Sequence, residues 1–263
     1  STSLKFDNIA LCEICSTGTA EPRPTQSDLD RFYASGDYWQ LSGNNADQMA
    51  HESSQSKLRV EHGLDHVETD SGLRVLDIGA GHGFVADWLS RQTRCTVNNY
   101  DFIELDDANA REIVRKKRSF EIKRLSSLDC ACAEAPYDLL FLNHVLEHVA
   151  DPFGFMTKVL AAMKPQAIAY VETPHADFRY KADVFPHTLF FTERSFAAMT
   201  QRLGVVTLEC ASFGAWPGTG AGRGEIAFRV LSAALHFSVK AGAPGVIPRI
   251  LDRAMWRYED LSL

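Results

Sequence analysis

The sequence has little of what marks a membrane protein or a nucleic-acid-binding protein. Its formal net charge is −7 at pH 7, and it contains no basic run with interleaved aromatic residues, so we expect no nucleic-acid partner. No apolar stretch reaches the ~18 residues that a membrane span requires, and the first residues form no signal-peptide pattern. These absences favour a cytoplasmic protein with no membrane span.

The cysteines lack the spacing of a complete metal site. Of the six cysteines, only Cys12 and Cys15 have the spacing C-x-x-C. A structural zinc site usually needs four ligands, commonly two such pairs. We therefore predict no metal ligands and regard bound zinc as the less favoured interpretation. The dispersed thiols suit a reducing cytoplasm.

What the sequence does have is a glycine-rich segment between a strand-like and a helix-like pattern. Residues 74–89 read RVLDIGAGHGFVADWL, an apolar run followed by three glycines at alternate positions and an amphipathic stretch. This pattern predicts a buried strand, a tight turn and the start of a helix. Nucleotide-type cofactors bind at such turns, because glycine lets the backbone approach the ligand and the helix start offers free N–H groups.

The residues around these glycines indicate the type of cofactor. A dinucleotide fingerprint requires a third glycine five residues after the first, where this chain has Phe84. Asp77, two residues before Gly79, would repel a diphosphate but attract an ammonium or a sulfonium. A cationic nucleoside without phosphate, such as S-adenosylmethionine, fits these residues.

Two further strand ends carry polar residues. Residues 95–100 form a predicted strand closed by Asp101, which follows Gly79 by 22 residues, near the spacing at which an acid meets a ribose diol. A solvated aspartate beside Glu104 is the alternative interpretation. Residues 138–142 form an apolar run typical of a central parallel strand, and it leads into the segment NHVLEH. Ligands bind beyond the carboxyl ends of such strands.

Together these segments resemble a known family. The glycine segment resembles motif I of the class I S-adenosylmethionine-dependent methyltransferases, and residues 144–148 resemble the H-x-L-E-H segment of small-molecule methyltransferases. Residues 185–196, FPHTLFFTERSF, are similar to a stretch of a bacterial subgroup, methyltransferase domain 23-like, that occurs with polysaccharide, sugar and secondary-metabolite pathways. A zinc ribbon often precedes the domain in that subgroup, and Cys12 and Cys15 resemble its second half. The resemblance covers residues 12–213.

The resemblance implies a Rossmann-like α/β fold. We expect a mostly parallel seven-stranded sheet with helices on both faces. An arm with a remnant ribbon would occupy residues 1–50, the methyltransferase domain residues 51–224 and a helical segment residues 225–263. Other expected elements are a helix at 55–67, strands at 120–125, 167–172 and 205–210, and a final strand at 225–231.

The resemblance also implies a set of cofactor contacts in the glycine segment and at the ends of the following strands. These residues are Asp77, Gly79, Ala80, Gly81, Gly83, Phe84, Asp101, Phe102, Ser126, Ser127, Leu128, Asn143 and His144. Many relatives have an acid where the two serines stand, which leaves the adenine contact open. In the arm, Tyr33, Tyr38 and Trp39 either close over the site as a lid or anchor the arm to the domain.

Methyl transfer is a displacement at a sulfonium carbon, and aligning the donor with the acceptor supplies part of the rate. A histidine suits the removal of the acceptor's proton at neutral pH. The candidates are His144, His148, His175 and His187, with Glu147 as an orienting or catalytic carboxylate. Each alone is more often structural, but as a set at one sheet edge we expect at least one to act, with His187 or His148 favoured.

The leading hypothesis is S-adenosylmethionine-dependent methyl transfer to a small-molecule acceptor. The acceptor would be a sugar, a nucleotide-sugar or a secondary metabolite, methylated on oxygen or nitrogen rather than carbon. A second hypothesis is a methyltransferase-like subunit of a biosynthetic complex that binds S-adenosylmethionine without catalysis. A nicotinamide-dependent reductase is disfavoured by Asp77 and Phe84. Packing of the C-terminal segment against a second subunit would make a homodimer.

Overall fold

Five parallel strands form the central sheet, and most of them coincide with the apolar runs of the sequence. In the computed structural model they are β3 (Leu73–Ile78), β4 (Val97–Ile103), β5 (Glu121–Leu125), β6 (Tyr137–Asn143) and β7 (Met163–Glu172). Their order across the sheet is β5-β4-β3-β6-β7, and every neighbouring pair is parallel. The strand order therefore reverses between β3 and β6, and ligands of such folds bind beyond the carboxyl ends at that point.

The structure describes residues 6, 8–34, 46–67, 72–179 and 186–212. Every described helix and strand belongs to one compact unit, Ser1–Leu208. The expected final strand and C-terminal helices lie outside the described residues, as do Tyr38, Trp39 and the side chain of Tyr33. No helix within the described residues has the length and apolar character of a membrane span.

Two apolar clusters cover opposite faces of the sheet, which explains the continuous apolar run of β6. Leu140 and Leu142 belong to one cluster, and Leu139 and Phe141 belong to the other. All four side chains are fully buried. A strand that is buried on both faces needs apolar residues at successive positions, so it loses the alternation of a half-exposed strand.

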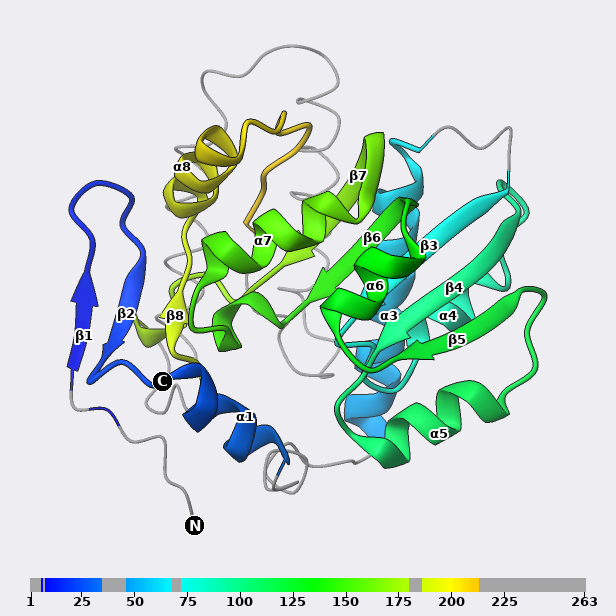
Figure 1. Ribbon diagram of the computed structural model, residues 1–263, viewed down its shortest axis with the longest axis horizontal. Helices are drawn as coiled ribbons and strands as arrows, with labels where there is room; N and C mark the ends of the chain where they lie inside the picture. The colour runs from blue at the N-terminus through cyan, green and yellow to red at the C-terminus, as the bar shows by residue number, and fades with distance from the viewer. Residues whose placement is uncertain (1–5, 7, 35–45, 68–71, 180–185, 213–263) are drawn as a thin grey trace, which may run out of the picture. The chain divides into compact units, whose positions relative to one another are not determined.

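Helices lie on both faces of the sheet, as Figure 1 shows. One face packs against α3 (Ala46–Leu64), α4 (Phe84–Leu89) and α5 (Asp107–Arg115). The other packs against α6 (Leu128–Glu134), α7 (Pro152–Ala161) and α8 (Glu193–Leu203). The predicted α/β architecture, a mostly parallel sheet between helices, is confirmed.

A small antiparallel sheet joins the N-terminal arm to a segment late in the chain (Figure 1). In this sheet β1 (Asn8–Leu11) pairs with β2 (Gly18–Glu21), which in turn pairs with β8 (Leu189–Phe190). The N–H of Ala20 also donates to the Thr188 carbonyl oxygen over 2.9 Å. Helix α1 (Gln26–Ala34) follows this sheet. The arm thus helps to position the segment that carries His187.

Several element boundaries differ from the expected ones. The helix expected at 55–67 begins at Ala46, so the expected boundary between residues 50 and 51 falls inside α3. The strand expected at 95–100 runs instead from Val97 to Ile103. Asp101 therefore does not close its strand, which continues for two more residues.

The strand expected at 205–210 is wrong, because these residues form no strand. Helix α8 ends at Leu203 and is capped by Gly204 in a left-handed conformation, and Val206 and Leu208 beyond it are exposed. β-branched residues favour a strand only where a neighbouring edge is available for pairing and packing. The described residues accordingly contain five of the seven strands that we expected in the central sheet.

Candidate functional site

The glycine turn after β3 has the conformation that its sequence predicts. Gly79, Gly81 and Gly83 all have positive φ values, of 74°, 54° and 74°. A Cβ atom on Gly79 would collide with Val145, and one on Gly83 would lie 2.7 Å from Ile113 Cγ1. At Gly81 nothing lies within 4 Å of such a Cβ. Two glycines are therefore required by packing, whereas the third borders open space that a ligand can enter.

Asp77 lies in β3 just before this turn and is 1 % exposed. The Tyr100 hydroxyl donates a short hydrogen bond to its Oδ2 atom, and Oδ1 is buried with no hydrogen-bond partner among the described residues. Burial raises the pKa of Asp77 to about 7, the hydrogen bond from Tyr100 opposes that rise and the charge of Glu104 adds to it. A nearby cation would favour the ionised form of this carboxyl.

Glu104 directly follows β4 and lies against the turn. Its Oε2 atom accepts the N–H of Gly81 over 2.7 Å, and its Oε1 atom accepts the N–H of Asp106 over 2.8 Å. Burial raises the pKa of Glu104, and the hydrogen bonds from Asp106 and Gly81 oppose the rise. The turn is thus lined by two buried carboxyl groups, those of Asp77 and Glu104.

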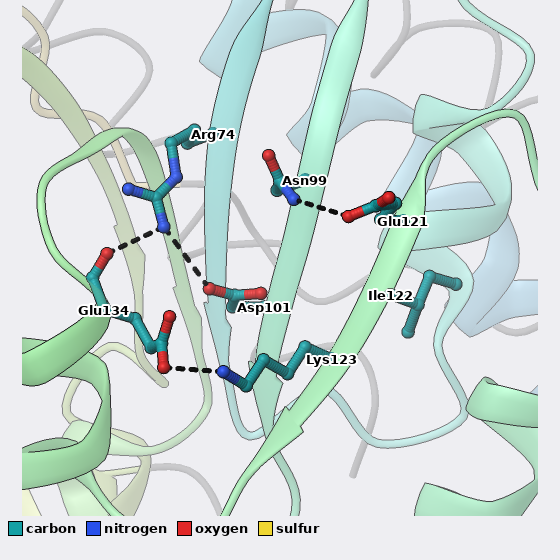
Figure 2. A pocket seen from close by; sticks show the side chains of 7 residues that line it. All are labelled: Arg74, Asn99, Asp101, Glu121, Ile122, Lys123 and Glu134. Carbon is teal, nitrogen blue, oxygen red and sulfur yellow. Dashed lines mark hydrogen bonds and ion pairs between the residues drawn. The ribbon is translucent and has the colours of Figure 1, made fainter.

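Asp101, which we expected at the end of its strand, lies three residues before Glu104, inside β4, and pairs in register with Leu76. The Tyr137 hydroxyl donates to Asp101 Oδ2 over 2.7 Å, and Arg74 Nη2 lies 3.9 Å from the same oxygen. Figure 2 shows that Asp101 lines a pocket on the sheet face together with Arg74 and Lys123. Its side chain therefore belongs to that pocket, and its expected contact with ribose stays a prediction.

The other residues expected to bind the cofactor differ in burial and in the elements that carry them. Phe102 is fully buried in the core, and Phe84 begins α4. Ser126 follows β5, and Ser127 caps α6 by accepting the Cys130 N–H over 3.3 Å, with Leu128 as the first residue of that helix. Within the turn, the Ala80 N–H donates to the Ile103 carbonyl oxygen over 3.2 Å. The serines and Leu128 stand at the end of β5, and Asn143 and His144 stand at the end of β6, as the resemblance implies.

A charged group lies beyond the ends of β6 and β7. Arg59 of α3 donates two hydrogen bonds to Glu172, from Nε to Oε2 over 3.0 Å and from Nη2 to Oε1 over 2.6 Å. His144 Nε2 lies 3.0 Å from Glu172 Oε1 and 3.2 Å from Arg59 Nη2. Asn143 ends β6 beside Glu172, and its Oδ1 atom is buried with no hydrogen-bond partner among the described residues.

The protonation of this group follows from its neighbours. Desolvation lowers the pKa of His144, but the carboxylates of Glu147 and Glu172 outweigh it and raise the pKa to about 9. Burial would raise the pKa of Glu172, but hydrogen bonds from His144 and Arg59 hold it well below its usual range. At neutral pH His144 is therefore a cation beside a carboxylate.

A second and more deeply buried cluster contains Glu147, His148 and His187. The first two belong to η1 (Leu146–His148), and His187 precedes β8. Glu147 is 1 % exposed, and the His148 and His187 rings are 5.1 Å apart. His187 Nδ1 lies 2.8 Å from Oδ2 of the buried Asp177. The structure thus brings together three of the five expected catalytic residues in one cluster.

The remaining two candidates lie differently. His144 contacts the edge of the cluster, because its Nδ1 atom is 3.5 Å from Glu147 Oε1. His175 forms a β-bridge with Phe191. Among the described residues it makes no hydrogen bond or ion pair with either group.

Sequence reasoning missed four residues of these groups, namely Arg59, Glu104, Glu172 and Asp177. Glu104 and Glu172 had a usable signal, because each stands at the carboxyl end of a strand, the position that singled out Asp77. Arg59 and Asp177 had no such signal. Arg59 lies in the helix before the central sheet and Asp177 in a turn after its last strand, β7, and both reach the site only in the folded chain.

A model of the family described as "Methyltransferase domain" matches residues 49–209. The chain is similar to the glycine/sarcosine/dimethylglycine N-methyltransferase of Actinopolyspora halophila, with 25 % identity over 60 % of this chain and 29 % of that protein. It is also similar to the ubiquinone biosynthesis O-methyltransferase of Dinoroseobacter shibae, with 31 % identity over 44 % of this chain and 48 % of that protein. The chain therefore spans about half the length of one relative and under a third of the other.

Solved structures share the fold. A S-adenosylmethionine-dependent methyltransferase of Leishmania major superposes with a TM-score of 0.56 and 17 % identity, covering 76 % of this chain and 84 % of that one. At this level of identity the likeness extends to the fold alone. It agrees with the parallel sheet and the flanking helices described above.

Proposed function

The chain belongs to the class I S-adenosylmethionine-dependent methyltransferases, and we propose that it transfers a methyl group from S-adenosylmethionine to an oxygen or nitrogen of a small polar acceptor. The observation that carries the proposal is the presence, at one edge of the sheet, of an open glycine turn lined by carboxyl groups beside a cluster of histidines and carboxylates. Val145, which follows His144 in the chain, packs against Gly79 of the turn. The first suits a cationic nucleoside, and the second suits an acceptor with an exchangeable proton.

The cofactor would lie over Gly81, with its cationic part near Asp77. Two acids are candidates for the ribose diol, Asp101 from its spacing and Glu104 from its place at the turn. Glu104 adjoins Gly81 and uses one lone pair on each oxygen for the backbone, which leaves further acceptor sites for hydroxyl groups. We therefore assign the ribose to Glu104 and keep Asp101 as the competing assignment.

The acceptor would lie beyond β6 and β7. His144 is already protonated at neutral pH, because the carboxylates of Glu147 and Glu172 raise its pKa, so it is a poor proton acceptor. Burial lowers the pKa of His148 to about 4 against the pull of Glu147, which makes it a weak base. His187 is the remaining member of the cluster, and its Nδ1 atom lies 2.8 Å from Asp177 Oδ2, so we assign to its Nε2 atom the contact with the acceptor.

Relatives and sequence patterns support the class of acceptor. The printed names of the curated relatives include an N-methyltransferase and an O-methyltransferase, which favours transfer to a heteroatom. The similarity of residues 185–196 to a subgroup of sugar and secondary-metabolite pathways favours a sugar, a nucleotide-sugar or a related metabolite. The β1–β2 hairpin, which contains Cys12 and Cys15, would then be a remnant of that subgroup's zinc ribbon.

Calorimetry with S-adenosylhomocysteine, the product of methyl transfer, tests the cofactor site. We expect micromolar binding of S-adenosylhomocysteine and none of NADH. Glu104→Gln should weaken binding at least tenfold, because hydrogen bonds to a charged acceptor contribute about 1.5–3 kcal/mol each. Asp101→Asn is the matched control and should change affinity less than threefold.

The outcomes separate the assignments. A loss of affinity in Asp101→Asn alone would transfer the ribose contact to Asp101. Absence of S-adenosylhomocysteine binding in the unaltered chain would refute the proposed function. Transfer of a labelled methyl group to a panel of sugars, nucleotide-sugars and amines, with His187→Ala as the comparison, then tests turnover.

A further inference from the structure

Three side chains with metal-binding groups meet inside the protein. They are Glu147, His148 and His187, and their nearest ligand atoms all lie within 4.8 Å of one another. Two come from the turn after β6 and one from the segment before β8, forty residues later. Two partly exposed imidazoles thus converge on a buried carboxylate.

The Glu147 carboxylate is short of hydrogen bonds. The residue is 1 % exposed, and neither oxygen accepts a hydrogen bond from the described residues. The nearest side-chain nitrogen atoms are those of the protonated His144, with Nδ1 at 3.5 Å, and of the neutral His148, with Nε2 at 3.8 Å, and both distances exceed that of a good hydrogen bond. A buried carboxylate without donors is strongly unfavourable. A metal cation held between its oxygen and the two rings would give this carboxylate a directly bound positive partner.

Each imidazole also contacts an oxygen atom outside the cluster, as metal-bound histidines do. His187 Nδ1 lies 2.8 Å from the Asp177 carboxylate. The His148 ring makes a hydrogen bond with the backbone of Pro186, and because proline has no N–H the acceptor is its carbonyl oxygen. A ligating histidine usually donates its second ring N–H to a carboxylate or a carbonyl group, which fixes the tautomer and the ring orientation.

The two segments are also tied to each other. The backbone N–H of Thr188 donates to the Glu147 carbonyl oxygen over 3.1 Å, and the Thr188 hydroxyl donates to the same oxygen over 3.2 Å. These bonds hold His187 against the turn that carries Glu147 and His148. The arrangement is therefore set by the backbone as well as by the side chains.

We propose that Glu147, His148 and His187 form a binding site for a divalent first-row transition-metal ion such as Zn²⁺. Two imidazoles and one carboxylate suit such ions, and a three-ligand set leaves coordination positions open. Ligand atoms about 2.0–2.2 Å from a zinc ion lie closer together than 4.8 Å, so binding draws the three groups inward. The sequence expectation of no metal rested on the spacing of the cysteines, which says nothing about this cluster.

The site lies at the edge where the proposed function places the acceptor. With the ion bound, His187 Nε2 would be a ligand and could not accept a proton, so the ion would replace it as the group that activates the acceptor. An open coordination position there would take an acceptor oxygen and lower the pKa of its hydroxyl group. This catalytic role rests on the proposed function, whereas the metal site itself does not.

Metal titration of the full chain tests the site. The Cys12→Ser/Cys15→Ser variant serves as the background, because it removes the other pair of ligands with suitable spacing. After treatment with a chelator, we expect one equivalent of Co²⁺ to bind with visible absorption bands and to be displaced by Zn²⁺. Mg²⁺ at the same concentration should not compete, because it prefers oxygen ligands.

Variants locate the ion. Glu147→Gln and His187→Ala should each weaken Zn²⁺ binding more than a hundredfold, and Asp177→Asn should weaken it about 10–100-fold through the orientation of His187. His175→Ala is the matched control, a nearby histidine outside the cluster, and should keep the affinity. Absence of stoichiometric binding would overturn the proposal, as would equal binding in the Glu147→Gln and His187→Ala variants.

Calorimetry with S-adenosylhomocysteine on the same samples keeps the two proposals apart. Retained binding in the cluster variants shows that they are folded and that a loss of metal is local. Metal binding without S-adenosylhomocysteine binding would refute the proposed function and leave the metal site standing. The reverse result would refute the metal site alone.

Discussion

The cofactor side of the sheet edge is built mainly from backbone, whereas the side beyond β6 and β7 is built from side chains of distant segments. The glycine turn spans five residues, and its shape depends on three positive φ angles. The cluster of Glu147, His148 and His187 depends on contacts across forty residues of sequence and on support from Asp177. We infer that the first tolerates few substitutions in the turn, while the second is sensitive to changes far away in the chain.

The largest expected effect concerns Asp77, the buried acid of the cofactor side. Burial raises its pKa from 3.8 to about 7, with Tyr100 opposing the rise and Glu104 adding to it. The folded chain therefore binds the proton more tightly than the unfolded chain, so stability from this group is full below about pH 4 and is lost as the pH rises to about 7. At about 1.4 kcal/mol per pH unit the loss amounts to ~4 kcal/mol.

Denaturant unfolding between pH 4 and 8 measures this loss. Asp77→Asn should remove the pH dependence that Asp77 contributes and should be more stable than the unaltered chain at pH 8. It should also bind S-adenosylmethionine more weakly, because the ionised carboxyl attracts the cation. If the free energy of unfolding changed with pH equally in the two proteins, Asp77 would not be the source of the pH dependence.

The next largest effect concerns the turn itself. Gly79→Ala should lower the free energy of unfolding by about 3 kcal/mol, because it adds a left-handed alanine and a collision with Val145. Gly81→Ala, at a φ of 54° but with open space around it, should lower it by only about 1–2 kcal/mol. Equal losses in the two variants would mean that packing against Val145 does not restrict this turn.

On the side of the site beyond β6 and β7, Arg59→Met should lower the free energy of unfolding by about 2 kcal/mol. It leaves Glu172 without the guanidinium that donates two hydrogen bonds to it, in a place where the arginine side chain is only 12 % exposed. Arg94→Met removes an exposed pair with Asp65 and should change stability by less than ~0.5 kcal/mol. Chemical denaturation measures the free energy of unfolding of both variants. Equal losses would mean that the buried pair stabilises the fold no more than the exposed pair does.

The smallest effect concerns the link between the two segments of the cluster. Thr188→Val removes the hydroxyl that donates to the Glu147 carbonyl oxygen and should destabilise the fold by about 1 kcal/mol. Thr157→Val, which removes a hydroxyl on the exposed side of α7, is the matched control. S-adenosylhomocysteine affinity should stay unchanged in both, because neither side chain contacts the glycine turn. A tenfold loss in Thr188→Val alone would show that the two halves are coupled.

Local patterns predicted much of the fold. The apolar runs marked β3 and β6, and the alternate glycines marked the turn after β3. The family resemblance placed β5, whose residues EIKRL are mostly polar. The strand at 205–210 failed, because strand formation depends on an edge to pair with and a local pattern does not contain that edge. The predicted end of β4 was wrong by three residues, so Glu104 rather than Asp101 is the acid that directly follows the strand.

The sequence by itself determined the glycine turn and its place after a buried strand, because left-handed φ angles and apolar runs are properties of adjacent residues. It also determined that His144, Glu147 and His148 follow a central strand. Only the tertiary structure decided which of these polar groups meet. Arg59 reaches Glu172 from a helix that precedes the whole sheet, and His187 reaches Glu147 through a strand that pairs with the N-terminal arm. Such meetings depend on how distant elements pack, and no local pattern records them.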